Sequence, residues 1–466
     1  MIDFLILQKK LLESISKLTI PPTWIARVLF MFNSNICYGM SFISDIKFID
    51  NHFINDDNSV FKIKCLCNDL INNFIINFAI LSLKLLNNDL KSTYLEQYIL
   101  NELETKIKNC YKYQLFLKDN MYTIDGLNKK ITTYYNLRNT DGWKESNNSI
   151  ILPNGDYRIN PKIPIDKEKI IDYKAWCPLD GQKMIGSSWG KIQGLIDQED
   201  FEEIESDLLD LYKNIDIEKE AFEVFNKSLN LNEIEKCVAE FWAGIGGSVT
   251  PPGFWNMFML CCLTKKKYKN YLLELKHFYE LNCGLFQISI IIWNIKYKCL
   301  QARPIQTIRY LFSDEEFNYY FGHGIGNLWL PYQESRLWTP PFCDFLSGHS
   351  GFSSVGSYFM SKFFGENIKH LKSSINPDEL KLLSPLFKNN DTTSYDLSKI
   401  HIKPNSSNID NNTPVQEIIL KFDTWEEMAQ SAGMSRIYGG IHYNSSNYIS
   451  FDTGKKVAFL INKKFC

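Results

Sequence analysis

The sequence predicts an all-α protein, a large bundle of helices joined by long irregular loops, and two observations carry this prediction. Apolar residues recur at spacings of three and four through the longest apolar segments, which is the periodicity of helices with a buried face. Two stretches without this periodicity, residues 117–190 and 389–414, are rich in loop-forming residues such as Gly, Asn, Pro and Ser. We expect irregular loops there, the first with room for a short hairpin. Helices joined in this way make an all-α fold.

The expected helices cover much of the chain. They span Trp24–Ile43, Phe61–Leu86, Tyr94–Phe116, Phe201–Phe225, Glu233–Ala243, Tyr268–Lys298, Ser347–Phe364 and Trp425–Tyr438. A further apolar run, Trp255–Leu263, also has a helical character. Because no repeat and no linker interrupts the chain, we expect one continuous unit, with residues 1–230 as a helical scaffold packed onto a core of residues 231–466.

Composition narrows the class of protein. The chain has 466 residues, 45% of them hydrophobic, so it can bury a large core. The net charge is −2 and the pI is about 6.4, which argues against a nucleic-acid binder. Twelve cysteines occur without any CxxC spacing. This pattern favours buried free thiols in a reducing compartment over disulfides or a zinc site.

The N-terminus and the apolar runs predict a soluble, cytoplasmic protein. The first residues, MIDFLILQKKLLES, carry charges after the apolar start and lack a small-residue cleavage site, so they are a poor signal peptide. No apolar run is expected to reach the roughly 18 residues of a membrane span. The nearest, Phe74–Leu86, is interrupted by Asn77 and Lys84.

The stretch PFCDFLSGHSGFSSVGSYF, residues 341–359, places a histidine at the start of a predicted helix. Ser347 is a good N-cap, so the helix should begin near Gly348, with His349 in its first turn. The first N–H groups of a helix have no internal partner and attract an oxyanion. The alternative is an ordinary capped helix with a surface histidine.

Cations that would complete an anion site occur in the stretch WNIKYKCLQARP, residues 293–304. On one continuous helix, Lys296 and Arg303 would lie about 20° apart around the axis. Arg303 precedes Pro304, which disfavours helix there, so we expect the arginine at the helix exit. Two cations after an apolar segment are costly to bury without an anion. The alternative is that both side chains emerge into solvent.

A third stretch, SAGMSRIYGGIHYNSS at residues 431–446, adds another cation and a second histidine. On an unbroken helix Arg436 and His442 would lie about 120° apart. The intervening Gly439-Gly440 can break the helix and let both side chains turn toward one point. The alternative is a helix that simply ends at a Gly-Gly cap.

In this order and spacing, the three motifs resemble those of the vanadium-dependent haloperoxidases and the type 2 phosphatidic acid phosphatase-like acid phosphatases. The surrounding sequences AEFWAGIGGSVTPPGFWN, residues 239–256, and SRIYGGIHY, residues 435–443, are similar to those of soluble bacterial haloperoxidase-type proteins. The resemblance covers roughly residues 20–460 and is specific from about residue 236 onward. It implies a helical-bundle fold of the vanadium haloperoxidase type, with residues 231–466 as the catalytic core.

The resemblance also implies roles for the oxyanion-binding residues. Lys296, Arg303 and Arg436 would neutralise the oxygens of vanadate or phosphate, and a planar guanidinium suits this contact. The Ser347 hydroxyl and the Gly348 N–H would add neutral donors. Vanadate would be the cofactor of a haloperoxidase, whereas a phosphatase of this type needs none.

The two histidines would have different roles by the same resemblance. His442 would bond the central atom, which is vanadium in a peroxidase and phosphorus in a phosphatase. His349 would be the acid–base group. Trp293 and Phe342 match positions that line the halide site in chloroperoxidase-type relatives, although both are equally good core residues.

Three positions depart from the family pattern. Ser446 stands four residues after His442, where the family often has an aspartate that would fix the aim of the histidine. Leu346 replaces the proline that usually precedes the Ser-Gly-His motif, and Phe254 replaces a histidine common in soluble relatives. Of the three, Ser446 bears most directly on activity.

Three functional hypotheses therefore stand after the sequence. The first is a vanadate enzyme that uses hydrogen peroxide to oxidise halide or an organic substrate. The second is a vanadium-free acid phosphatase that acts through a phosphohistidine at His442. The third is a degenerate protein that binds phosphate without turnover, for which Ser446 is the main support. Each implies a small-molecule partner and no nucleic acid, and a homo-oligomer is possible.

Overall fold

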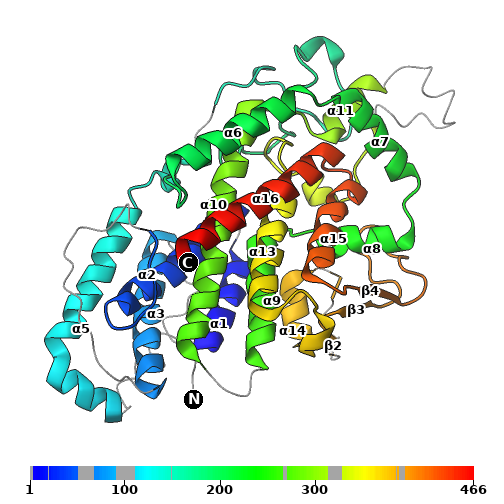
Figure 1. The fold of residues 1–466 in the computed structure, drawn as a ribbon. Coiled ribbons are helices and arrows are strands. Elements are labelled where there is room, and N and C mark those ends of the chain that lie inside the picture. The colour runs from blue at the N-terminus through cyan, green and yellow to red at the C-terminus, as the bar shows by residue number, and fades with distance from the viewer. Residues whose placement is uncertain are drawn as a thin grey trace.

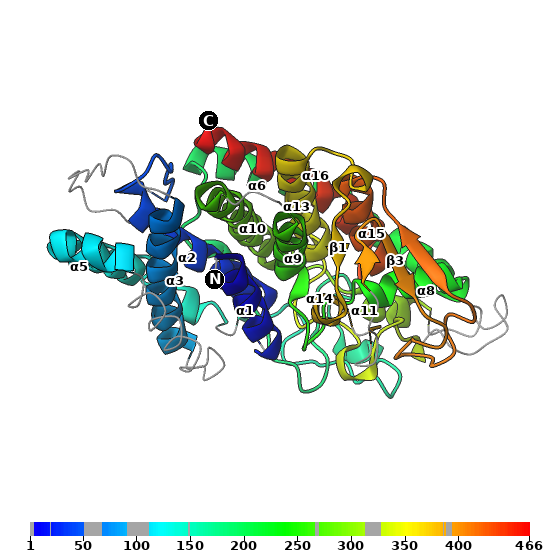
Figure 2. The ribbon, with the colours of Figure 1, turned by 90° about the horizontal axis from the view of Figure 1, so that it is seen from below.

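The 29-residue helix α10 (Tyr271–Cys299) lies at the centre of the fold in the computed structural model. Its middle part, residues 277–293, is buried on every side rather than along one stripe. Helix α2 (Pro22–Ser41) from the N-terminal part packs against it, and so does α13 (Gly348–Phe364) from the C-terminal part. Figures 1 and 2 show α10 between these two helices.

The structure describes residues 4–18, 20–50, 68–90, 111–147, 150–265, 270–312, 328–384, 386–387 and 394–466. Of the predicted helices, Tyr94–Phe116 and the first part of Phe61–Leu86 lie largely or partly outside these residues. The statements that follow concern the described parts alone.

Small residues allow the C-terminal helices to pack closely around α13. This helix contacts α9 (Thr250–Thr264), α15 (Trp425–Tyr438) and α16 (Asn444–Phe465). A Cβ at Gly356 would stand 2.0 Å from the Trp255 ring, and one at Gly454 would stand 2.6 Å from the Ser354 side chain. The Gly- and Ser-rich composition of α13 is therefore a packing requirement. Helix α8 (Glu233–Phe241) covers α15 on the outside.

The N-terminal helices extend the same hydrophobic core. Helices α1 (Phe4–Lys17), α3 (Asn68–Leu90) and α5 (Tyr111–Arg138) gather around α2 on one side of α10 (Figure 1). Two further helices, α6 (Gln198–Lys213) and α7 (Ile217–Leu229), contact α10 and α11 (Pro304–Leu311), respectively. One cluster of buried apolar side chains runs from α1 to α16.

The remaining elements are short. Strand β1 (Ser374–Ile375) pairs antiparallel with β2 (Tyr395–Asp396), and β3 (Lys399–Ile402) pairs antiparallel with β4 (Ile418–Lys421). In the second pair Ile400 stands opposite Leu420. Helix α14 (Pro377–Leu383) begins with a capping box formed by Asn376 and Glu379. Single 3₁₀ turns occur at Trp143–Glu145, Lys167–Lys169, Trp189–Lys191, Ser335–Leu337 and Lys369–Leu371.

The all-α prediction is confirmed, and the errors concern particular segments. Residues 117–138 were expected to be loop but belong to α5, whose buried Ile124, Leu127 and Ile131 recur at helical spacing among polar neighbours. The expected helix Phe201–Phe225 is two helices, because Asp216 caps α7 by accepting the N–H groups of Glu218 and Lys219. The 389–414 segment contains β2 and β3 rather than loop alone.

Other differences concern elements that the sequence patterns did not predict. Helices α1, α11, α14 and α16 were not predicted. The described part of residues 117–190 contains an isolated bridge between Ile159 and Leu179 but no hairpin ladder. Helix α16 has Gly454, Thr453 and many polar residues, so its helical signal is weak and its packing against α13 stabilises it.

The expectation that no apolar run is long enough to span a membrane is wrong for helix α3. The segment Leu70–Leu90 is long and apolar enough to cross a bilayer, with a mean hydropathy of 1.4 over its best window, although no such run was expected. In this structure 56% of that window is buried inside the protein, where it packs against α2 and α5. Apolar helices of the protein core have the same length and composition.

The described cysteines follow the predicted pattern of free thiols. Seven of them are buried, at positions 37, 177, 237, 261, 262, 283 and 343. Cys299 is partly buried and Cys466 is exposed. Burial raises the pKa of Cys343 to about 12, so this thiol stays protonated beside the candidate site.

Close packing at α13 gives a first prediction. The substitution Gly356→Ala should lower the free energy of unfolding by about 1–3 kcal/mol, because the added methyl group overlaps the Trp255 ring. The matched control is Gly126→Ala in α5, where no atom lies within 4 Å of the new Cβ. It should raise stability by about 1 kcal/mol through helix propensity alone. Urea unfolding followed by circular dichroism measures both; equal effects would contradict the packing described.

Candidate active site

The first of three segments that build the candidate active site follows α10. The helix ends because Leu300 adopts a left-handed conformation with φ 50°. Arg303 lies outside the helix, as the cap residue before Pro304, which begins α11. Lys296 and Arg303 therefore belong to different elements, and the shared helical face considered from the sequence does not exist. The arginine does stand at the helix exit.

The second segment is the start of α13. Ser347 is the N-cap residue, and its side-chain oxygen accepts the N–H of Ser350 at 3.4 Å. Gly348 is the first helical residue and packs beside the Trp293 ring, which would lie 3.6 Å from an added Cβ. His349 consequently stands in the first turn, at the positive end of the helix dipole.

The third segment joins α15 to α16. Helix α15 ends at Tyr438, and Gly440 takes a φ of 68° that favours glycine. The turn brings His442 to a position just before α16. Arg436, in the last turn of α15, and His442 thus line the same cavity, although they would point apart on one unbroken helix.

Lys296 is held by backbone oxygens of the loop before α13. Its ammonium group donates hydrogen bonds to the carbonyls of Cys343 (2.8 Å) and Asp344 (2.7 Å). The side chain is fully buried, and this burial, followed by the nearby Arg303, holds the pKa of Lys296 well below its usual range. A buried ammonium group is stabilised by a negative charge close to it.

Three polar contacts hold the Arg303 side chain, and they use two of its three guanidinium nitrogens, Nε and Nη1. Nε donates to the Phe342 carbonyl at 2.8 Å, and Nη1 donates to the Ile441 carbonyl at 2.7 Å. Nη1 also lies 3.0 Å from His442 Nε2. Among the residues that the structure describes, the buried Nη2 group has no hydrogen-bond partner. Unpaired buried donors of this kind are costly, so the group is suited to a bound oxyanion.

Arg436 and His349 share one backbone acceptor, the carbonyl of Trp242. Arg436 Nη2 donates to it at 3.0 Å, and His349 Nε2 lies 2.9 Å from it. Since a carbonyl oxygen only accepts, the proton of a neutral His349 ring is on Nε2 and its lone pair is on Nδ1. Burial, followed by the charge of Arg303, lowers the pKa of Arg436 to about 9. Burial, followed by Arg436, holds the pKa of His349 well below its usual value.

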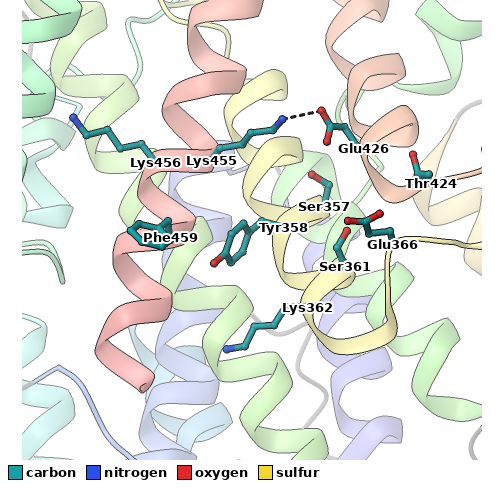
Figure 3. A pocket seen from close by; sticks show the side chains of 10 residues that line it. All are labelled: Ser357, Tyr358, Ser361, Lys362, Glu366, Thr424, Glu426, Lys455, Lys456 and Phe459. Atoms are coloured by element: carbon teal, nitrogen blue, oxygen red, sulfur yellow. Dashed lines mark hydrogen bonds and ion pairs between the residues drawn. The ribbon is translucent and has the colours of Figure 1, made fainter.

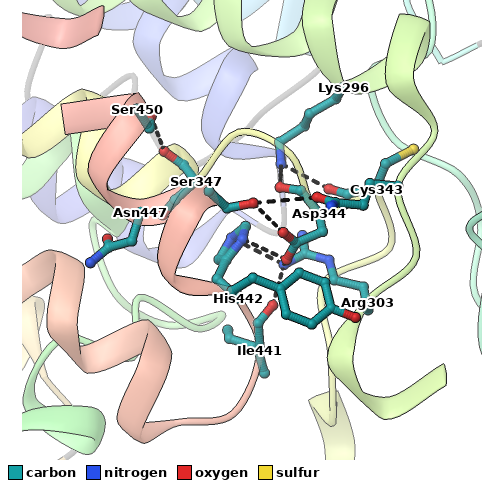
Figure 4. Close-up of polar contacts among 12 residues, drawn as sticks. Lys296, Arg303, Cys343, Asp344, Ser347, Ile441, His442, Asn447 and Ser450 are labelled. Atoms are coloured by element: carbon teal, nitrogen blue, oxygen red, sulfur yellow. Dashed lines mark hydrogen bonds and ion pairs between the residues drawn. The ribbon is translucent and has the colours of Figure 1, made fainter. Parts of the chain in front are cut away.

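His442 lies between Arg303 and a carboxylate that the sequence did not single out. Its Nδ1 is 2.8 Å from Asp344 Oδ1, and its Nε2 faces the Arg303 guanidinium (Figure 4). The pKa of His442 is held well below its usual value, chiefly by burial and then by the charges of Arg303, Lys296 and Arg436. At neutral pH the ring is therefore uncharged.

The charges of the site do not balance. Lys296, Arg303 and Arg436 are buried together, whereas the buried carboxylate that contacts them is Asp344, whose Oδ1 lies 3.7 Å from Arg303 Nη1. Burial raises the pKa of Asp344 to about 6, against the opposing pull of Arg303 and Lys296. An excess of buried positive charge is stabilised by an anion, and the arrangement is chemically suited to bind one.

All nine residues singled out in the sequence lie at or directly behind one cavity of about 550 Å³. Lining residues from that set are Trp293, Phe342, Gly348, His349, Arg436 and His442. Lys296 and Arg303 stand behind the Phe342 ring, each 5.1 Å from its centroid. Ser347 directly precedes the lining residue Gly348. The three segments thus meet at a single place.

Comparison with known proteins agrees with this geometry. Residues 276–465 match the family model described as the VCPO second helical-bundle domain. The match covers 190 of the 466 residues, from α10 to α16. None of the curated proteins matches the sequence.

Solved haloperoxidases share the fold over nearly the whole chain. A bacterial vanadium-dependent iodoperoxidase aligns with a TM-score of 0.57 and 16% identity, over 98% of this chain and 95% of that one. A bacterial vanadium-dependent chloroperoxidase aligns in its holo form with a TM-score of 0.58 and 14% identity, over 97% and 93% of the two chains. Its apo form gives 0.59 and 15%, over 95% and 93%. At these identities the likeness concerns the fold.

The cavity is mostly apolar away from the charged residues. Trp293 and Phe342 stack against each other with their ring centroids 5.0 Å apart. In the described part of the chain, Trp293 Nε1 has no hydrogen-bond partner. The opposite wall comes from the N-terminal part of the chain, through Leu18, Ile20, Pro21, Pro22, Trp24, Met184 and Ile185.

A larger depression of about 800 Å³ lies elsewhere, between α13, α15 and α16 (Figure 3). Lys455 and Glu426 form an ion pair of 2.7 Å across it, and Lys456, Glu366 and Phe459 also line it. The depression contains none of the predicted site residues and no histidine. Size alone therefore does not identify the reactive cavity.

Sequence reasoning missed three residues of the site. The Trp242 carbonyl positions both His349 and Arg436, but backbone oxygens leave no signal in a sequence. Gly244 has a φ of 62°, and a Cβ there would approach His349 Nε2 to 3.0 Å. Its only signal was the Gly-rich stretch around it. Asp344 lies within the quoted 341–359 stretch, and a buried aspartate five residues before His349 gave no recognised motif.

The unbalanced charge predicts that an inert oxyanion stabilises the protein. Orthophosphate at 100 times its Kd should raise the free energy of unfolding by about 2.7 kcal/mol through binding to the folded state. The substitution Arg303→Gln should weaken phosphate binding by roughly 10-fold or more, since it removes charge-assisted bonds. Arg309→Gln is the control, because Arg309 is equally buried but bonds to backbone carbonyls of Trp329 and Pro161. Thermal denaturation with and without phosphate measures both; loss of the phosphate effect in the control alone would contradict this site.

The low pKa of His349 predicts a dependence of stability on pH. An unfolded histidine takes up a proton near pH 6.5, whereas folded His349 stays neutral, so the unfolded state binds more protons below that pH. Stability due to this residue is thus present above pH 6.5 and lost on acidification. Compared with the wild type, His349→Gln should flatten the fall in unfolding free energy between pH 6 and pH 5 by up to about 1.4 kcal/mol. Urea titrations at these pH values measure the difference, and parallel slopes would contradict the pKa direction.

Proposed function

We propose that the protein is a vanadate-dependent peroxidase that uses hydrogen peroxide to oxidise halide or an organic substrate. The observation that supports this most strongly is the buried cluster of Lys296, Arg303 and Arg436 beside a neutral His442. Three buried cations, with one donor group of Arg303 unpaired among the described residues, fit a multiply charged oxyanion. The match of residues 276–465 to the VCPO second helical-bundle domain supports the same proposal.

The residues present fit vanadate. Lys296, Arg303 and Arg436 would contact its oxygens, together with the Ser347 hydroxyl and the Gly348 N–H at the start of α13. His442 Nε2 carries the lone pair in the neutral ring, because its neighbour Arg303 Nη1 can only donate, and this nitrogen would be the ligand. Bound vanadate supplies a Lewis-acid centre that activates peroxide for transfer of an oxygen atom.

His349 is placed to handle the proton of peroxide. Its Nε2–H is tied to the Trp242 carbonyl, which leaves the Nδ1 lone pair as the basic site of the ring. The lowered pKa keeps the ring neutral at physiological pH, as a proton acceptor must be. Gly244 allows the ring to approach the chain closely, because a Cβ there would stand 3.0 Å from His349 Nε2.

The apolar cavity suits the molecule that is oxidised. The Trp293 and Phe342 rings, which line the cavity, offer a polarisable wall for a halide. Beyond them, about 550 Å³ of mostly apolar space could hold a small organic substrate. We propose that residues 1–230 form a scaffold that also supplies one wall of this cavity, through Leu18, Trp24 and Met184.

An acid phosphatase is the second candidate, because the same cage serves both chemistries. The His442 Nε2 lone pair could attack phosphorus, and His349 could protonate the leaving oxygen. The aromatic pair Trp293 and Phe342, which lines the cavity and has no role in phosphoryl transfer, favours the peroxidase. A protein that binds phosphate without turnover is the third candidate, for which the sequence offered Ser446.

One set of assays distinguishes the three. We expect oxidation of bromide or iodide by hydrogen peroxide to require added orthovanadate and to fall by at least 100-fold in His442→Ala, which lacks the ligand. The control His277→Ala removes a histidine that stacks on Phe363 at 4.1 Å, away from the cavity, and should keep activity. Hydrolysis of a phosphomonoester that vanadate inhibits would instead establish the phosphatase. Phosphate binding with neither activity would establish the degenerate protein.

A further inference from the structure

We infer that Asp344 is a positioning residue of this site, which holds His442 with its proton on Nδ1 and leaves Nε2 unprotonated as the atom that would bond the oxyanion. The inference rests on the proposed function and adds to it a residue that no motif assigns. In the sequence, the position expected for such a carboxylate is 446, where this chain has serine.

The tautomer of His442 follows from its two neighbours. Arg303 Nη1, 3.0 Å from Nε2, has hydrogens and no lone pair, so Nε2 must accept. A neutral ring then carries its proton on Nδ1, which lies 2.8 Å from Asp344 Oδ1. The two atoms are not aligned as an ideal hydrogen bond. The contact is therefore mainly the attraction of a buried carboxylate for the Nδ1–H group, and it still fixes which nitrogen is protonated.

The Asp344 carboxylate is itself held in place, with Ser446 supplying part of the support. The Ser446 hydroxyl donates to Oδ2, and the backbone N–H of Asp344 donates to the Gln301 carbonyl at 2.9 Å. Both side chains are fully buried. An aspartate at 446 would set a second carboxylate against the first, whereas serine offers the donor that Asp344 needs. Asp344 thus supplies the carboxylate that the family pattern has at position 446, and Ser446 supports it with a hydrogen bond.

Asp344 also connects the other cations to the histidine. Its carbonyl oxygen accepts from Lys296 Nζ at 2.7 Å, and its Oδ1 lies 3.7 Å from Arg303 Nη1 (Figure 4). Substitution of the side chain would leave the backbone contact to Lys296 intact. The effect of such a variant can therefore be assigned to the carboxylate and to the two groups that face it, Arg303 and His442.

A mere counter-ion and a positioning residue differ in one measurable respect. Removing a negative charge beside three cations should leave binding of orthophosphate unchanged or tighter, because phosphate is attracted by charge alone. Orthovanadate additionally bonds to His442 Nε2, so it depends on the tautomer and aim of the ring. The ratio of vanadate affinity to phosphate affinity separates the two roles.

The test measures this ratio by calorimetric titration of the full chain with orthovanadate and with orthophosphate. We expect the Asp344→Asn variant to lose about 10- to 100-fold in vanadate affinity, the usual effect of removing a group that orients a ligand histidine. Phosphate affinity should not fall. Should Asp344→Asn fail to fold, Ser446→Ala, which removes the donor to the carboxylate, should shift the ratio in the same direction by a smaller factor.

Two further variants complete the experiment. The double substitution Asp344→Ser with Ser446→Asp moves the carboxylate to the other position and should restore part of the vanadate preference. Asp50→Asn is the control, because Asp50 is an equally buried aspartate that pairs with Arg138 at 3.2 Å in the N-terminal part. It should lower stability without changing the ratio.

Two results would overturn these conclusions at different levels. A wild-type protein that binds vanadate no better than phosphate would refute the proposed peroxidase, and the role of Asp344 with it. A wild-type preference for vanadate that persists unchanged in Asp344→Asn and Ser446→Ala would refute the role of Asp344 alone.

Discussion

An excess of buried positive charge is the constraint on which the rest of this site depends. Lys296, Arg303 and Arg436 come from three different segments, and in the described part of the chain Arg303 pairs with the buried carboxylate of Asp344. Cations without counter-ions are expensive to remove from water, so the folded protein retains a strong preference for an anion at this point. Burial is the main cause that lowers the pKa of both nearby histidines, and the buried cations lower it further.

Backbone carbonyls, more than side chains, keep these cations in place. The carbonyl of Trp242 holds Arg436 and His349, those of Phe342 and Ile441 hold Arg303, and those of the 343–344 loop hold Lys296. Neutral oxygens satisfy the donors without cancelling the charge, which remains available to the ligand. The site therefore requires a rigid frame, and the buried helices α10, α13 and α15 supply it at their ends. Close contacts of glycines such as Gly356 and Gly244 belong to this requirement.

The two parts of the chain contribute differently to the cavity. The C-terminal part supplies Arg436 and both histidines, whereas the N-terminal part supplies a mostly apolar wall that also includes Asn147 and Lys183. The charged residues and the apolar wall are thus adjacent, which is the arrangement that the proposed oxidation of a second substrate would require. Ser446 and Asp344 show that the chain keeps a carboxylate near His442 from another position of the sequence, so a missing motif residue does not by itself indicate a lost function.

The sequence by itself determined the fold class and the three segments of the site, because helical periodicity, an N-cap serine and a Gly-Gly break act locally and leave local patterns. It did not predict α5 within the polar 117–138 stretch, nor any of α16. Both helices are stabilised by packing against helices distant in the sequence. Only the tertiary structure decided that Arg303 caps α11 instead of extending α10, and that Asp344 and the Trp242 carbonyl stand beside the two histidines. Those contacts join residues about 100 positions apart, such as Asp344 and His442, so no local sequence pattern can predict them.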